Sequence, residues 1–186
     1  MCIRDSRKRG GWLAALFLGE TLTATAMGHF EHEIERAAVV ALFVPLIISS
    51  GGNSGSQATS IIIRSLALQE LRLRDWVYVL LKELRTSVAL GVFLGAVGFV
   101  RILLWYALGW HHYEGHPYLI GLTVWGSLIG VVTFGSIVGS MLPFLLRKVG
   151  FDPATASAPF VATLVDVTGL VIYFTVALLI LRGTLL

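Results

Sequence analysis

Long apolar stretches alternate with short polar segments along the chain. The apolar stretches cover residues 12–29, 37 to about 63, 86–110, 118–146 and 158–181. A helix needs roughly 20 mostly apolar residues to cross a hydrocarbon core of ~30 Å. The pattern therefore predicts an all-α membrane protein with five transmembrane helices, which would lie in a lipid bilayer.

Composition agrees with this prediction and excludes several other classes. Hydrophobic residues make up 56% of the 186 residues and charged residues 13%, against ~45–50% and ~25% in soluble domains. So little polar surface excludes a water-soluble globule and a disordered chain. Cys2 is the only cysteine, which excludes a secreted module stabilised by internal disulfides.

Most of the 14 basic residues lie in alternate connections between the apolar stretches. They are Arg4, Arg7, Lys8 and Arg9 before the first stretch, Arg64, Arg72, Arg74, Lys82 and Arg85 between the second and third, and Arg147 and Lys148 between the fourth and fifth. Cytoplasmic loops of membrane proteins carry the excess of Lys and Arg. We therefore expect a cytoplasmic N-terminus and an external C-terminus in the cell (inner) membrane.

Three ionisable residues fall inside apolar stretches: Glu20, Arg101 and Asp166. Such a residue costs about 2.5–3.5 kcal/mol on insertion scales and is a functional candidate by default. Arg101 is close enough to a helix end to reach the interface, and Glu20 fits a structural and a functional role equally. Asp166 shares a helix face with Ala162 and Thr163, and we expect it to line an ion pathway. The alternative is a hydrogen-bonded structural carboxyl.

Residues 51–57 are seven consecutive small or amide-bearing residues within the second apolar stretch. Irregular backbone at membrane depth is tolerated only inside protein or along a water-filled cavity. We expect a broken helix here whose oxygens are open to a cation, with a cytoplasmic turn as the alternative. Carboxylate, amide and carbonyl oxygens suit hard cations such as Mg²⁺ or Ca²⁺.

Other metal or catalytic chemistry is weakly indicated. His111, His112 and His116 share a short loop with Glu114. Zinc binding by this group is possible chemistry, but a solvated loop is the expected interpretation. No pairing of a nucleophile with a base and no phosphate-binding glycine motif indicates an enzyme.

Several segments together resemble the MgtE-type magnesium transporters. They are PLIISSGGNSGSQATS at residues 45–60, LRDW at 73–76, KEL at 82–84, MLPFLLRK at 141–148, DPA at 152–154 and PFVATLVDVTGLVIYF at 159–174. They occur in the family's order and extend the resemblance over residues 10 to 184.

The resemblance implies a homodimer with a pore on its two-fold axis, lined by the second and fifth helices. It implies that Asp166 and the carbonyl of Ala162 form the central Mg²⁺ site. The residues that it makes pore-lining or accessory, together with Thr163 from the face of Asp166, are Gly51, Gly52, Asn53, Glu31, Glu35, Glu83 and Asp152.

The resemblance also implies a domain organisation. Residues 1–10 are expected to be a cytoplasmic N-terminal stub and residues 11–186 a transmembrane pore domain. Family members carry a cytoplasmic N-terminal domain and a pair of CBS domains that close the pore. Neither matches this sequence, so we expect a fragment or a chain that lacks this gate.

The function implied is a Mg²⁺-selective channel that moves Mg²⁺ into the cytoplasm down its electrochemical gradient, with Mg²⁺ as transported ion and pore ligand. One alternative is a gradient-coupled divalent cation transporter. Others are a non-conducting membrane scaffold and a membrane enzyme that uses Asp166 with the histidines.

Overall fold

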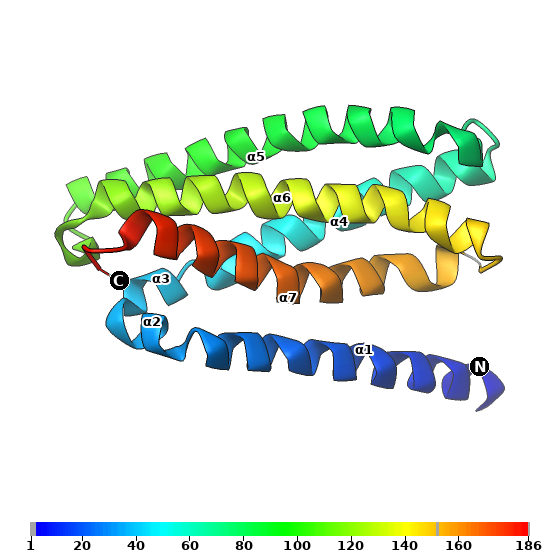
Figure 1. Ribbon diagram of the computed structural model, residues 1–186, viewed down its shortest axis with the longest axis horizontal. Coiled ribbons are helices and arrows are strands. Elements are labelled where there is room, and N and C mark those ends of the chain that lie inside the picture. Colours follow the sequence, from blue (N-terminus) through cyan, green and yellow to red (C-terminus); the bar gives the residue numbers. More distant parts are fainter. Residues whose placement is uncertain (1–2, 152, 186) are drawn as a thin grey trace.

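The computed structural model describes residues 3–151 and 153–185, and its long helices run side by side along one direction (Figure 1). In chain order the elements are α1 (Ile3–His29), α2 (Glu31–Arg36), α3 (Ala38–Ala41), α4 (Val44–Ala67), η1 (Leu73–Asp75), α5 (Trp76–Ala107), η2 (Tyr113–Gly115), α6 (Pro117–Lys148) and α7 (Pro153–Leu181). The described residues contain no strand. The prediction of an all-α protein is confirmed.

Four segments are long and apolar enough to cross a membrane. They are Ala38–Ala67, Leu73–Ala107, Pro117–Lys148 and Ala158–Leu181. They correspond to the second to fifth predicted spans. The first, at residues 12–29, lies within the helix α1 but is not among the four in the part of the chain that the structure describes. Its role as a fifth span stays a prediction.

Helix α5 is longer than the sequence pattern indicated. It begins at Trp76, well before the expected start at residue 86, and has 32 residues. At 1.5 Å per residue this is about 48 Å, more than the ~30 Å hydrocarbon core requires. Lys82 and Arg85 therefore lie on a helix and not in a loop, which corrects the placement expected from their charge.

Helix α6 lies at the centre of the bundle. It packs against α4, α5 and α7, while α4 also packs against α7. Val124, Val131 and Val132 of α6 are fully buried in the largest apolar cluster. Helix α1 contacts α7 along one flank of the bundle (Figure 1). Leu16 is the one buried side chain among the described side chains of α1.

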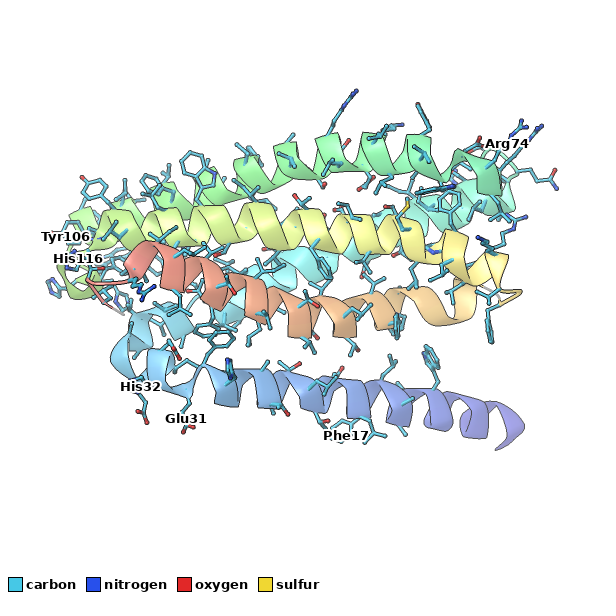
Figure 2. The ribbon with its side chains drawn as sticks, in the orientation of Figure 1. Phe17, Glu31, His32, Arg74, Tyr106 and His116 are labelled. Atoms are coloured by element: carbon cyan, nitrogen blue, oxygen red, sulfur yellow. The ribbon has the colours of Figure 1, made fainter. Side chains whose placement is uncertain are left out.

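The connections segregate to the two ends of the bundle. The start of α1, the α4–α5 connection and the α6–α7 connection lie at one end, and the C-terminus and the α5–α6 connection lie at the other (Figure 1). Figure 2 shows Arg74 at the first end, and Tyr106 and His116 at the second. The basic connections thus gather at one end, named the basic end below. Its cytoplasmic location stays a prediction.

Candidate functional site

The segment expected to be a break in the second span is a regular helix. Helix α4 runs without interruption from Val44 to Ala67 and contains residues 51–57. The expected broken backbone and its alternative, a cytoplasmic turn, are both wrong. Gly51 and Gly55 of this segment are buried against a neighbouring helix and do not face lipid.

Four glycines bring the backbones of α4 and α6 into direct contact. A Cβ placed on Gly55 would lie 2.8 Å from the carbonyl oxygen of Gly135 and 2.7 Å from Cγ1 of Val161. A Cβ on Gly139 would collide with the backbone of Gly55, and one on Gly135 with the backbone of Gly51. Small residues four apart allow such close approach of membrane helices. We call Gly51, Gly55, Gly135 and Gly139 the glycine interface.

Hydroxyl groups bond across the glycine interface. The Oγ atoms of Ser54 and Ser136 share a hydrogen bond of 2.6 Å. The Oγ1 of Thr59 donates to the carbonyl oxygens of Gly55 and Gly139, both at 2.9 Å. Polar groups in hydrocarbon need such internal partners. These bonds fix the register of α4 on α6 while satisfying the hydroxyls of a membrane-embedded helix.

Another face of α4 is polar and open. Asn53, Ser56, Gln57 and Ser60 follow one another at helical spacing on one face and, with Ile61, line an open hollow of about 590 Å³. We call these four residues the α4 polar face. An exposed row of amides and hydroxyls along a candidate membrane helix indicates contact with water or polar protein groups. Sequence reasoning identified Asn53 as a site residue but not Ser60. Ser60 lies seven residues after Asn53, and this helical spacing could have placed it on the same face.

Asp166 lies near the middle of α7. Its side chain is partly buried, as is Ala162 one turn earlier. Between them Thr163 is buried, and its Oγ1 donates to the carbonyl oxygen of Pro159 at 3.3 Å. The structure therefore brings the three predicted residues of α7 onto adjacent positions of one helix surface.

A second carboxylate approaches Asp166 from α1. A Cβ on Gly19 would lie only 3.0 Å from Cγ2 of Thr163, so α1 lies close to α7 at this level. The neighbouring Glu20 interacts electrostatically with Asp166. Glu20 is exposed in the single chain. Two acidic residues on neighbouring helices therefore face the same region.

The C-terminal half of α7 is fixed by Tyr173. Its hydroxyl donates to the carbonyl oxygen of Val40 at 2.6 Å, and the side chain is 1% exposed. The next residue, Phe174, stacks on Phe30 with ring centroids 4.8 Å apart. These contacts attach α7 to the segment that precedes α4, and they position the helix that carries Asp166.

Several predicted accessory residues lie on other elements. Glu31 and Glu35 are exposed on α2 (Figure 2 shows Glu31). Glu83 is partly buried on α5, a helix that packs against α6. Asp152 lies outside the described residues. Within the part of the chain that the structure covers, no three His, Cys, Asp or Glu side chains come together as a metal site.

The end opposite the basic end is rich in aromatic contacts. The guanidinium of Arg101 lies 3.6 Å from the ring centroid of Trp105, a cation–π contact. The ring of His111 stacks on Tyr113 with centroids 5.2 Å apart. Burial raises the pKa of Tyr113 above its usual range, and the charge of Arg101 opposes this rise. His111, His112 and His116 are exposed.

Comparison with known proteins gives concordant results. Residues 44–176 match the model of the MgtE family, described as divalent cation transporters. The chain is 43% identical over 172 residues to the magnesium transporter MgtE of Thermus thermophilus. It is 32% identical over 170 residues to the magnesium transporter MgtE of Bacillus subtilis. A third relative, the magnesium transporter MgtE of Enterococcus faecalis, is 30% identical over 181 residues.

The matches cover most of this chain but a smaller part of the relatives. They include 92%, 91% and 97% of the chain for the Thermus, Bacillus and Enterococcus proteins, respectively. The corresponding shares of the relatives are 36%, 36% and 38%. The chain thus spans about a third of the length of the curated relatives that it matches.

Proposed function

Because the chain belongs to the MgtE family of divalent cation transporters, we propose that it forms a membrane pathway for Mg²⁺. It is an integral membrane protein, and its family consists of transporters and not enzymes. Two observations carry the proposal: an acidic residue, Asp166, within α7, and the open α4 polar face. Both lie on candidate membrane helices, where lipid contact would be unfavourable for them.

The proposed pathway lies between two copies of the chain. The described residues of one chain supply no group of three acidic or histidine ligands, whereas Mg²⁺ prefers six oxygen ligands in octahedral geometry. A two-fold axis beside α4 and α7 would place two Asp166 carboxylates and two α4 polar faces around one path. The carbonyl of Ala162 and the backbone near Gly52 would add further oxygens.

The carboxylate pair would select for divalent ions. Two carboxylates that face each other repel, and a cation of charge two between them removes this repulsion more completely than a monovalent ion. Mg²⁺ gives up its water reluctantly. Asp166 and the α4 polar face would therefore contact the waters of a hydrated ion, which keeps the site weak enough to release it.

The proposed direction is inward, through a channel. An inside-negative membrane potential contributes 2.3 kcal/mol per charge per 100 mV, or about 4.6 kcal/mol for Mg²⁺. This driving force is sufficient for uptake without a coupled ion. A gradient-coupled transporter is the second candidate within the same class, and it predicts that Mg²⁺ entry depends on a proton or sodium gradient.

The test is Mg²⁺ entry into liposomes that contain the purified chain, with Asp166→Asn measured alongside. This variant keeps the shape of the side chain and removes its charge. We expect entry that rises with an inside-negative potential, and a loss of at least tenfold in Asp166→Asn. Thr175→Val, on the exposed part of α7, is the matched control and should conduct normally.

A binding measurement separates failed conduction from a failed site. A ligand that binds only the folded state raises thermal stability. Mg²⁺ should therefore raise the unfolding temperature of the unsubstituted chain more than that of the Asp166→Asn variant. Equal Mg²⁺ entry and equal stabilisation in both proteins would contradict the proposed site. Altered assembly without any ion flux would favour the scaffold alternative.

A further inference from the structure

An apolar hollow opens at the basic end of the bundle, and it shares no lining residue with the hollow at the α4 polar face. It has a volume of about 690 Å³ and is bounded by α5, α6 and α7. Its wall includes Trp76, Met141, Leu145, Phe160 and Leu164. Trp76 is 49% exposed and Leu145 58% exposed, so the hollow is accessible from the surroundings of the bundle.

The hollow extends along α6 from Lys148 to Ile137. The eleven helical steps between these residues correspond to about 16 Å, roughly half the thickness of a hydrocarbon core. The hollow is therefore about as long as the part of a lipid acyl chain that lies in one leaflet. It opens at the basic end and runs parallel to the helices. Trp76 stands near its mouth, as expected for a tryptophan at a membrane interface.

Basic side chains surround the mouth of the hollow. Lys148 forms part of its wall, and a second hollow of about 390 Å³ adjoins it and is lined by Gln69, Arg72 and Arg147. Leu73 lines both hollows, so they share a rim. The apolar hollow and a basic pocket thus lie next to each other at Leu73.

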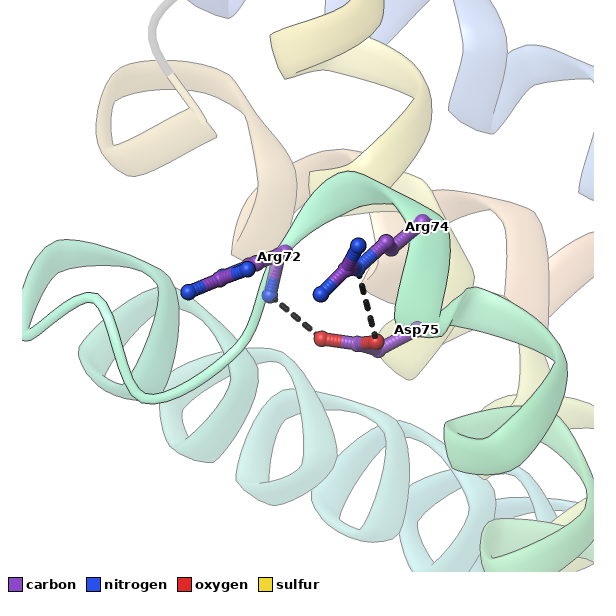
Figure 3. Close-up of polar contacts among 3 residues, drawn as sticks. All are labelled: Arg72, Arg74 and Asp75. Carbon is purple, nitrogen blue, oxygen red and sulfur yellow. Dashed lines mark hydrogen bonds and ion pairs between the residues drawn. The ribbon is translucent and has the colours of Figure 1, made fainter.

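These basic groups remain available to an anion. The carboxylate of Asp75 accepts a hydrogen bond from the backbone N–H of Arg72 at 2.8 Å and lies 4.0 Å from Nε of Arg74. Figure 3 shows the Arg72 side chain directed away from Asp75. Among the described residues, no carboxylate forms a salt bridge with Arg72 or Lys148. Arg147 donates from Nη1 to the carbonyl of Leu66 at 2.9 Å, which leaves other N–H groups of its guanidinium free to bind.

We propose that this site binds an anionic phospholipid, with an acyl chain along α6 and the phosphate held by Lys148, Arg72 and Arg147. Basic pockets between membrane helices are typical sites for anionic lipid head groups. Charge argues against a second copy of the chain as occupant. A two-fold axis along the membrane normal would bring the basic end of a second copy to the same level, where the two sets of basic side chains would repel each other. This inference is independent of ion transport.

The test is lipid retention measured by native mass spectrometry of the purified chain in detergent. Phosphatidylglycerol and phosphatidylcholine with identical acyl chains are the two probes. We expect phosphatidylglycerol to bind more tightly, and Lys148→Gln and Arg72→Gln each to weaken its binding about fivefold. Phosphatidylcholine carries the same phosphate, but its choline cancels the net charge, so its binding should change less than that of phosphatidylglycerol.

Arg74→Gln is the matched control. Arg74 lies at the same end and is exposed, but it lines neither hollow. Its removal should alter phosphatidylglycerol binding less than twofold. If Lys148→Gln, Arg72→Gln and Arg74→Gln weakened phosphatidylglycerol binding equally, the lipid would be attracted by the basic end in general. This result would overturn the specific site.

A second variant tests the apolar part of the site. Leu145→Trp adds volume at an exposed position of the wall, where the fold tolerates a larger side chain. It should lower retention of both lipids while the chain elutes normally from a sizing column. A change in oligomeric state with unchanged lipid retention would identify the hollow as an interface between copies and overturn the proposal.

Discussion

At the scale of single residues, the buried polar groups decide where α7 lies. Residues before and after Asp166 along α7 make the contacts that fix its position. Thr163 touches the position of Gly19 on α1, and Tyr173 bonds to Val40. The sequence pattern identified Asp166 because a charge in an apolar stretch is conspicuous. The role of Tyr173 depends on a partner 133 residues away, which no local pattern reveals.

Tyr173→Phe tests this contact. The substitution leaves the carbonyl of Val40 buried without its donor, and an unsatisfied buried group costs about 1–3 kcal/mol. We expect a lower unfolding temperature, measured by intrinsic fluorescence in detergent. Thr175→Val is the control, because its hydroxyl bonds within the exposed turn of α7 and its loss should have little effect. Equal stability of the two variants would show that the tyrosine bond contributes nothing.

At the scale of the helices, the glycines of α4 lower the helix propensity of the segment but allow it to pack closely against α6. Consecutive small residues at 51–57 indicated a break, because glycine disfavours an isolated helix. Packing decides otherwise. Gly51 and Gly55 are buried against α6, and the close contact compensates for the lost propensity. The recurrence of Gly51 and Gly55 at a spacing of four was the available signal, and it is matched by Gly135 and Gly139 on α6.

Gly55→Ala is the corresponding test. Its Cβ would lie 2.8 Å from a backbone oxygen that cannot move aside, and overpacking typically costs about 1–3 kcal/mol. Gly52→Ala is a matched control on the same helix, because nothing lies within 4 Å of its Cβ position. The control should be neutral or more stable by up to about 1 kcal/mol through helix propensity. Gly55→Ala should therefore lower the unfolding temperature, whereas Gly52→Ala should leave it unchanged or raise it.

The remaining elements were predictable to different degrees. The spans at 118–146 and 158–181 lie within α6 and α7, because uninterrupted apolar stretches leave little choice. The start of α5 was placed too late, since the polar residues Lys82 and Glu83 resemble a loop although they continue a helix. The α4 polar face became recognisable only once the segment around Asn53 was known to be helical.

At the scale of the whole molecule, the two ends of the bundle differ in charge, and the predicted orientation rests on this difference. The connections rich in Arg and Lys share one end of the bundle (Figure 1), as the positive-inside rule requires of alternate loops. The predicted five-span topology requires that α1 also crosses the membrane, although α1 is not among the four candidate spans of the described residues. Its exposed apolar residues, such as Phe17 and Leu18 at 65% and 67%, are suited to lipid or to a second copy.

Single-cysteine variants test this orientation. Cys2 is the only native cysteine, so Cys2→Ser provides a background for His112→Cys and Arg74→Cys at exposed positions of opposite ends. A membrane-impermeant maleimide added to intact cells should label the cysteine at position 112 and not the one at position 74. Permeabilised cells should label both. The reverse pattern in intact cells would invert the predicted topology.

The glycine interface has a mechanical consequence. Where backbone meets backbone, no side chain is present that could change its rotamer and absorb a displacement, and packed interfaces do not deform continuously. Helices α4 and α6 must then move as one rigid body. Any conformational change that widens or narrows a path beside α4 would have to shift α7 against this pair, at contacts where side chains such as Val131, Val161 and Val165 lie between the backbones.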